Sequence, residues 1–322
     1  MKKNLFWMLA IMILASCLLA ACASGETPSE APAPTAPPAP TTVPEPTAEQ
    51  EPEFAADAEL DAAYTTFLDD MLAYNTTSLE TLNEMLLEDV PPFVLDVRSY
   101  EEVETNGRIP TSVVIPLREL AKPESIAQMP GFDTTIVSYC GSGWRCTIAL
   151  TALEALGWED VLCLKGGSFA GWVDAGYAVE EGVPEPVALD VAQPDAALLS
   201  IIDEMLSAVP DGFGGISVDD LNAAIVENPD LVIIDARTAE ELVEKGAIEN
   251  NINIPLQSFI SDKANWPSDK DATIVIYCGS GHRSTIAMTI LWTYGYTDVR
   301  SLKSGFTAWT EAGYPVVEVA AP

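Results

Sequence analysis

The segment Cys140-Gly141-Ser142-Gly143-Trp144-Arg145-Cys146 decides the fold prediction, because it returns 138 positions later as Cys278-Gly279-Ser280-Gly281-His282-Arg283-Ser284. A β-branched, apolar run precedes each copy, at residues 135–139 and 273–277, and an apolar run follows each arginine. This order predicts a buried parallel strand, a loop and then a helix. Each cysteine is therefore expected at the carboxyl end of a strand, where open parallel sheets bind their ligands.

The glycines of the two loops predict a site for a negatively charged sulfur. Glycine lets the backbone curl so that successive N–H groups point inward, and the start of the following helix adds a positive field. This field favours a thiolate over a thiol, so Cys140 and Cys278 are the predicted catalytic residues. The other loop residues are predicted to bind the substrate or an anion; they are Gly141, Ser142, Gly143, Trp144, Arg145, Gly279, Ser280, Gly281, His282 and Arg283. The alternative of inert core cysteines is disfavoured, because the same glycine loop occurs twice.

Further matched blocks surround the loops in the same order in both halves of the chain. They pair residues 95–98 with 234–237, 107–109 with 246–248, 115–117 with 254–256, and 164–167 with 302–305. With these blocks, residues 57 to 319 resemble two rhodanese (sulfurtransferase) domains in tandem. The halves differ from the family where a histidine often follows a glycine, since Arg108 and Ala247 stand there.

The resemblance implies a fold and a reaction. The implied fold is α/β, with two tandem domains that each hold a mainly parallel sheet with helices on both faces. The implied enzyme is a thiosulfate sulfurtransferase that moves sulfane sulfur from thiosulfate or a similar donor, through a cysteine persulfide, to cyanide or a thiol. Four residues separate each cysteine from its arginine, whereas related phosphatase loops carry five, and the shorter loop favours sulfur. No cofactor is expected, and a single histidine excludes a histidine-rich metal site.

Other functions remain open at this stage. Both loops begin Cys-Gly-Ser-Gly, which resembles 3-mercaptopyruvate sulfurtransferases. Two further alternatives are a persulfide carrier without turnover and a redox-responsive binding module.

Several residues near the loops have two interpretations. Arg145 and Arg283 either contact the sulfonate or carboxylate of a donor or pair with neighbouring carboxylates. The aspartates of the pairs Asp96 with Arg98 and Asp235 with Arg237 are expected to hold these arginines close to the site rather than to act in it. His282 has Trp144 as its counterpart, which favours a rim or specificity role over that of a general base.

The cysteines of the first half raise a separate question. Cys146 occupies the place of Ser284 and either packs as a small thiol or closes a disulfide with Cys140 that switches the first site off. Cys163 lies in an apolar run and matches Ser301, so a structural position is expected there.

The first residues predict export. Lys2 and Lys3 precede an apolar run at residues 5–21, and residues 1–21 are predicted to be a signal peptide. The ending Leu19-Ala20-Ala21-Cys22 resembles a bacterial lipobox, which implies a lipid on Cys22 and an extracytoplasmic protein anchored to a bacterial membrane. The alternatives are an ordinary signal peptide and an uncleaved anchor. Residues 22–53 are rich in proline, alanine and threonine and are predicted to be a disordered tether.

The remaining chain is predicted to form domains at 54–183 and 195–322, with a linker at 184–194 and an independent core in each domain. Helices are expected at 57–74, 78–88, 195–208 and 218–228, with a capping box over Thr77 to Glu80 and Ser217 as an N-cap. The chain carries 15 basic and 49 acidic residues, a formal charge of −34. So acidic a chain argues against binding nucleic acid, and the sequence identifies no protein partner.

Overall fold

The computed structural model describes residues 51–320. The predicted signal peptide, the lipidation site Cys22 and most of the predicted tether lie outside these residues. The last residues of the predicted tether, 51–53, are described by the structure and lie in helix α1 (Glu51–Asp70). Within the described part of the chain, every helix is too short or too polar to cross a lipid bilayer.

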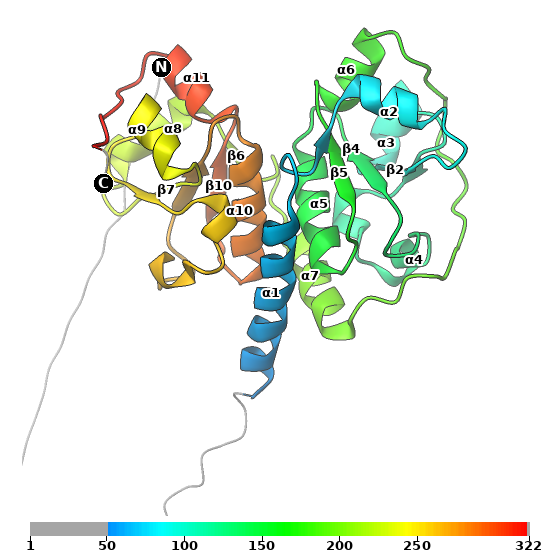
Figure 1. Ribbon diagram of the computed structural model, residues 1–322, viewed down its shortest axis with the longest axis horizontal. Coiled ribbons are helices and arrows are strands. Elements are labelled where there is room, and N and C mark those ends of the chain that lie inside the picture. Colours follow the sequence, from blue (N-terminus) through cyan, green and yellow to red (C-terminus); the bar gives the residue numbers. More distant parts are fainter. Residues whose placement is uncertain (1–50, 321–322) are drawn as a thin grey trace, which may run out of the picture. The chain divides into compact units, whose positions relative to one another are not determined.

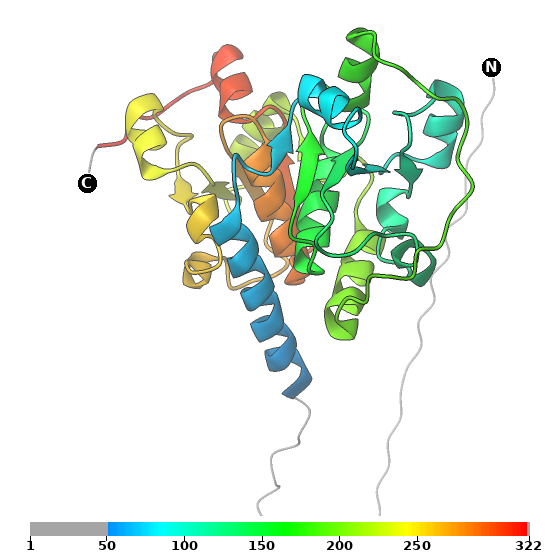
Figure 2. The same cartoon turned by 45° about the vertical axis from the view of Figure 1, so that its right-hand side comes forward.

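The first half folds around a five-stranded parallel sheet (Figure 2). Its strands in spatial order are β1 (Thr76–Thr77), β5 (Val161–Leu164), β4 (Ile136–Tyr139), β2 (Phe93–Asp96) and β3 (Val113–Val114). All four residues of β4 are buried because helices cover both faces of the sheet. Helix α5 (Arg145–Ala155) packs on one face, and α2 (Leu79–Met85) and α6 (Ser168–Asp174) on the other. The shorter elements are α3 (Tyr100–Asn106), η1 (Leu117–Glu119) and α4 (Pro123–Ile126).

The second half repeats this topology. Its parallel strands follow the order β6 (Gly215–Ile216), β10 (Val299–Leu302), β9 (Ile274–Tyr277), β7 (Val232–Asp235) and β8 (Asn251–Asn253). Its helical elements are α7 (Ala196–Ala208), α8 (Val218–Glu227), α9 (Ala239–Lys245), η2 (Leu256–Ser258), η3 (Lys263–Asn265), α10 (His282–Thr293) and α11 (Gly305–Glu311). Two parallel α/β sheets flanked by helices confirm the predicted fold class.

Helix starts follow the expected chemistry with one correction. Ser217 caps α8, and its side chain accepts the N–H of Asp220. The predicted capping box over Thr77 to Glu80 is wrong, because Ser78 is the N-cap of α2 and accepts the N–H of Thr81. Complete capping boxes begin α3 and α9 instead, and their glutamates take part in the candidate site described below.

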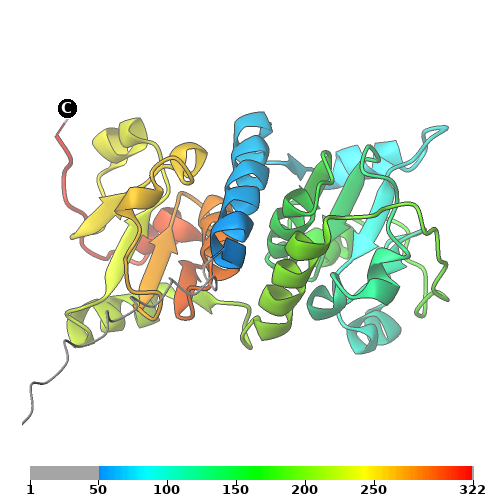
Figure 3. The same ribbon diagram turned by 90° about the horizontal axis from the view of Figure 1, so that it is seen from below.

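The helices that precede each sheet link the two halves (Figures 1 and 3). From α1, the Asp61 carboxylate pairs with Lys263 at 2.7 Å, and the Tyr64 hydroxyl lies 2.8 Å from Thr293 Oγ1 of α10. From α7, Asp203 pairs with Lys122 of the first half at 3.0 Å.

The helices α1, α5, α7 and α10 therefore enclose one apolar core that runs through both halves. The expectation of two independent cores is wrong on this face of the sheets, because each leading helix covers apolar surface of both halves. Only the opposite faces keep separate clusters.

Candidate functional site

The two loop cysteines occupy equivalent positions directly after β4 and β9. Cys140 Sγ accepts the Gly143 N–H at 3.2 Å, and Cys278 Sγ accepts the Gly281 N–H at 3.1 Å. Both glycines have φ of 97°, in the left-handed region where a side chain would strain the backbone. Each loop therefore curls back on its own sulfur and presents it with a hydrogen-bond donor, an arrangement that suits a thiolate.

The backbone of each loop contacts the segment that follows the last strand in chain order, β5 in the first half and β10 in the second. In the first half Ser168, the first residue of α6, contributes, because its hydroxyl accepts the Cys140 N–H at 2.9 Å. In the second half a side chain at Gly305 would place its Cβ 2.4 Å from the Cys278 carbonyl oxygen. Ser168 and Gly305 are each the first residue of the helix that follows. The backbone of Cys140 thus has a side-chain partner, whereas the second half requires close backbone packing.

Both loop arginines are neutralised by glutamates. Arg145 binds Glu102 through two hydrogen bonds of 2.6 and 2.7 Å, and Arg283 binds Glu241 through two of 2.6 and 2.8 Å. The hydrogen bonds from the arginines lower the pKa of each glutamate to about 2. Of the two interpretations of these arginines, donor contact and pairing with carboxylates, the structure shows the pairing.

Glu102 and Glu241 were not singled out in the sequence, although a signal was present. Each is the last residue of a Ser/Thr-x-x-Glu pattern, at Ser99 to Glu102 and Thr238 to Glu241, and each closes a capping box. The same carboxylate therefore caps a helix and fixes the loop arginine.

The aspartate–arginine pairs of β2 and β7 form buried ion pairs. Asp96 meets Arg98 at 2.6 Å, and Arg98 also donates to the Gly107 carbonyl oxygen at 2.7 Å. Asp235 and Arg237 repeat this arrangement at 2.6 Å, with both side chains at most 1% exposed. The pairs tie the end of the strand to the segment after the next helix, which is a structural role.

His282 and Trp144 perform the same structural task in the two loops. The carbonyl oxygen of Tyr74 can only accept a hydrogen bond, so His282 Nε2 is protonated and donates to it at 2.8 Å. Trp144 Nε1 donates to the Phe213 carbonyl oxygen at 2.8 Å. Burial and the neighbouring charge of Lys165 lower the pKa of His282 to about 3, so the ring is neutral at neutral pH. These contacts bury His282 against residues of the first half and do not place it as a base beside either cysteine.

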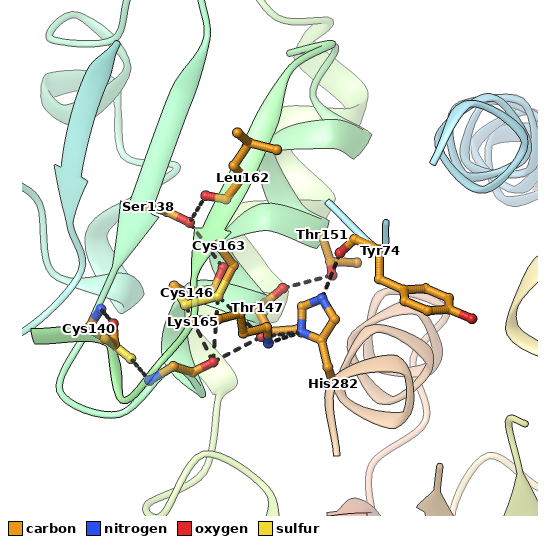
Figure 4. Close-up of a disulfide and its surroundings, with 12 residues drawn as sticks. Tyr74, Ser138, Cys140, Cys146, Thr147, Thr151, Leu162, Cys163, Lys165 and His282 are labelled. Atoms are coloured by element: carbon orange, nitrogen blue, oxygen red, sulfur yellow. Dashed lines mark hydrogen bonds between the residues drawn. A yellow bond between two sulfur atoms is a disulfide. The ribbon is translucent and has the colours of Figure 1, made fainter. Parts of the chain in front are cut away.

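Cys146 forms a disulfide with Cys163, with Cα atoms 5.4 Å apart, and Cys140 is free (Figure 4). The hypothesis of a disulfide between Cys140 and Cys146 is contradicted, because the Cys146 sulfur is already bonded. Cys163 has the expected structural position, here as half of that disulfide.

The second half has a hydroxyl pair in place of this disulfide. Ser301 donates to Ser284 Oγ at 2.8 Å, and Ser284 Oγ lies 3.5 Å from Cys278 Sγ. The second thiol consequently has a hydroxyl neighbour that the first thiol lacks.

The described residues bring together no group of three or more histidine, cysteine or acidic side chains that could hold a metal ion. What the two halves do have is a strand, a glycine loop around a sulfur and a helix, repeated at one edge of each parallel sheet. This arrangement defines a class of α/β proteins in which a loop after a strand curls around the sulfur of its own first cysteine.

Comparison with known proteins identifies the family within this class. The model of the rhodanese-like domain matches residues 78–175 and 217–312, so the chain belongs to the rhodanese-like family and carries two such domains in tandem. A protein named sulfurtransferase from Allochromatium vinosum is 32% identical over 102 residues, which cover 32% of this chain and 92% of that protein.

Two further relatives are similar over a single domain. A putative mitochondrial thiosulfate sulfurtransferase of Schizosaccharomyces pombe is 30% identical over 93 residues, 25% of this chain and 63% of that protein. The crystal structure of a rhodanese-related protein from Thermoplasma volcanium is 30% identical and covers 32% of this chain and 96% of its own, with a TM-score of 0.29.

Proposed function

We propose that the protein is a sulfurtransferase that takes sulfane sulfur from thiosulfate or a similar donor through a persulfide on Cys140 and Cys278. The observation that carries the proposal is the pair of free cysteine sulfurs, each held in a glycine loop with a backbone N–H directed at it at 3.2 and 3.1 Å. The names of the relatives from Allochromatium vinosum and Schizosaccharomyces pombe support the same class of reaction.

The reaction has two balanced steps. A cysteine thiolate attacks the outer sulfur of thiosulfate, a new S–S bond forms, and the old S–S bond breaks with its electron pair on the departing sulfite. Cyanide or a thiolate then attacks the outer sulfur of the persulfide, which releases the cysteine thiolate and forms thiocyanate or a new persulfide. In both steps the negative charge stays on the cysteine or its outer sulfur, where the loop N–H groups stabilise it.

We also propose that the protein acts outside the cytoplasm, with a lipid on Cys22 as its membrane anchor. The support lies in the apolar run that ends at Cys22. The buried disulfide between Cys146 and Cys163 adds to it, since such bonds persist in oxidising compartments. Radiolabelled palmitate incorporation that disappears in Cys22→Ser would test the anchor.

The test of the activity is sulfur transfer from thiosulfate to cyanide by the wild type, Cys140→Ser, Cys278→Ser and the double variant. We expect turnover by each single variant, loss of turnover in the double variant, and a mass increase of about 32 Da on each remaining loop cysteine after donor alone. Absence of both turnover and adduct would overturn the proposal. An adduct without turnover would identify a carrier, and turnover with 3-mercaptopyruvate alone would change the donor.

A further inference from the structure

The two loops border one cavity of about 630 Å³ between the halves of the chain. Residues of both loops line it: Cys140 and Ser142 of the first, and Ser280 and Gly281 of the second, whose cysteine, Cys278, is not part of the lining. The loops also lie side by side, because a Cβ added at Gly281 would be 3.5 Å from the indole ring of Trp144. A small molecule in this cavity would therefore be next to both loops at once.

The cations that the loops themselves supply are already used. Arg145 and Arg283 are each held by a glutamate through two hydrogen bonds, and Arg98 and Arg237 are buried against aspartates. A bidentate arginine–carboxylate pair satisfies the guanidinium in charge and in geometry. Recognition of an anionic donor consequently needs a different positive charge.

Lys165 supplies such a charge in the cavity wall. It follows β5, and its ammonium group lies 2.7 Å from Nδ1 of His282, which comes from the other half (Figure 4). An ammonium group has three N–H donors, and His282 accepts one of them. No carboxylate among residues 57–320 forms an ion pair with Lys165, although the chain carries 49 acidic residues.

Lys165 is also electrostatically linked to both sulfurs. Burial lowers its pKa to about 8, while the negative charges of Cys278 and Cys140 act in the opposite direction. Partial burial of a lysine without a carboxylate partner is unfavourable, and a bound anion would compensate its charge. Lys303, the counterpart of Lys165, also lines the cavity and is exposed.

We propose that this cavity is a single anion site bordered by both loops, in which Lys165 binds the sulfonate or carboxylate group of the sulfur donor. The inference rests on the proposed sulfurtransferase function and adds the residue that recognises the donor. Because one lysine serves both loops, its removal affects sulfur transfer at Cys278 in the second half as well as at Cys140 in its own.

Binding tests the site separately from the chemistry. The full chain with Cys140→Ser and Cys278→Ser cannot transfer sulfur, so titration with thiosulfate in a calorimeter measures binding alone. We expect one thiosulfate per chain, and Lys165→Gln should weaken it at least about tenfold because a hydrogen bond to a charged group is lost. Glutamine removes the charge and keeps an N–H donor, on a side chain one bond shorter than that of lysine. Lys245→Gln, an exposed lysine at the end of α9, is the control with the same change in net charge and should leave binding unchanged.

Kinetics tests whether the site is shared. Lys165→Gln is combined with Cys140→Ser in one variant and with Cys278→Ser in another, and KM for thiosulfate is measured for both. We expect KM to rise at least about tenfold in both backgrounds, with a smaller change in kcat. A rise only where Cys140 is the remaining thiol would overturn the shared site. Unchanged thiosulfate binding in Lys165→Gln would overturn the inference and leave the sulfurtransferase function standing. Normal thiosulfate binding with no turnover by any variant would overturn the sulfurtransferase function and leave the anion site standing.

Discussion

The disulfide between Cys146 and Cys163 gives the sharpest stability prediction, because the second half provides its own control. Ser284 and Ser301 occupy the equivalent positions and are hydrogen-bonded at 2.8 Å. The double variant Cys146→Ser/Cys163→Ser therefore replaces the covalent bond with a side-chain pair that this fold already accommodates.

The magnitude follows from the length of the closed loop. The two cysteines are 17 positions apart, and the chain-entropy relation for a loop of that length gives a stabilisation of about 3 kcal/mol. A serine–serine hydrogen bond in the double variant stabilises it by about 1 kcal/mol. We thus expect the double variant to lose about 2 kcal/mol in free energy of unfolding, and the wild type to lose about 3 kcal/mol when it is reduced.

Urea unfolding followed by tryptophan fluorescence, with and without dithiothreitol, measures both effects. Reductant should lower the midpoint of the wild type and of Cys140→Ser/Cys278→Ser, which lacks the two loop thiols and keeps the disulfide. It should leave Cys146→Ser/Cys163→Ser unchanged. The reasoning would be refuted by a wild-type midpoint that ignores reductant, or by peptide mapping that links Cys146 to Cys140.

Three further predictions concern the shared core and the buried carboxyl groups. Ile202 is fully buried on α7 in the core common to both halves. Ile202→Ala should lower the free energy of unfolding by about 2–5 kcal/mol, and fluorescence and circular dichroism should still report one coincident transition. Burial raises the pKa of Glu154 from 4.5 to about 8, so stability should fall as pH rises through this interval, and Glu154→Gln should flatten that slope in urea midpoints. Arg283 lowers the pKa of Glu241 from 4.5 to about 2, so the opposite sign applies: its contribution is complete above pH 4.5 and is lost as pH falls toward 2. Glu241→Gln should flatten the acid limb of stability, whereas equal acid sensitivity of wild type and variant would contradict the assigned pair.

The parts of the site that were predictable are those written in consecutive residues. The loops from Cys140 and Cys278 lie between a buried strand and a helix, as the local apolar pattern indicated. A curled loop depends on glycine at positions such as Gly143, where φ is 97°. Local sequence determines such features because the backbone conformation and the hydrogen bonds involved span only a few residues.

The partners of the loops were not predictable in the same way. Glu102 reaches Arg145 across 43 positions and Lys165 reaches His282 across 117. The sequence suggested only Cys140 as a disulfide partner of Cys146, whereas the packing of α5 on β5 placed Cys163 there. Side chains that meet only after the sheets have formed leave no periodic signal in the chain.

By itself, therefore, the sequence determined two parallel α/β units, each with a thiol at the end of a strand, because strand period, glycine placement and repetition are local properties. Only the tertiary structure decided that α1 and α7 join both halves around one core. It also placed the two loops on one cavity, with Lys165 and Lys303 in its wall. Apolar surface on a helix indicates that the helix is buried, but the surface that covers it depends on which faces remain exposed once both sheets are complete.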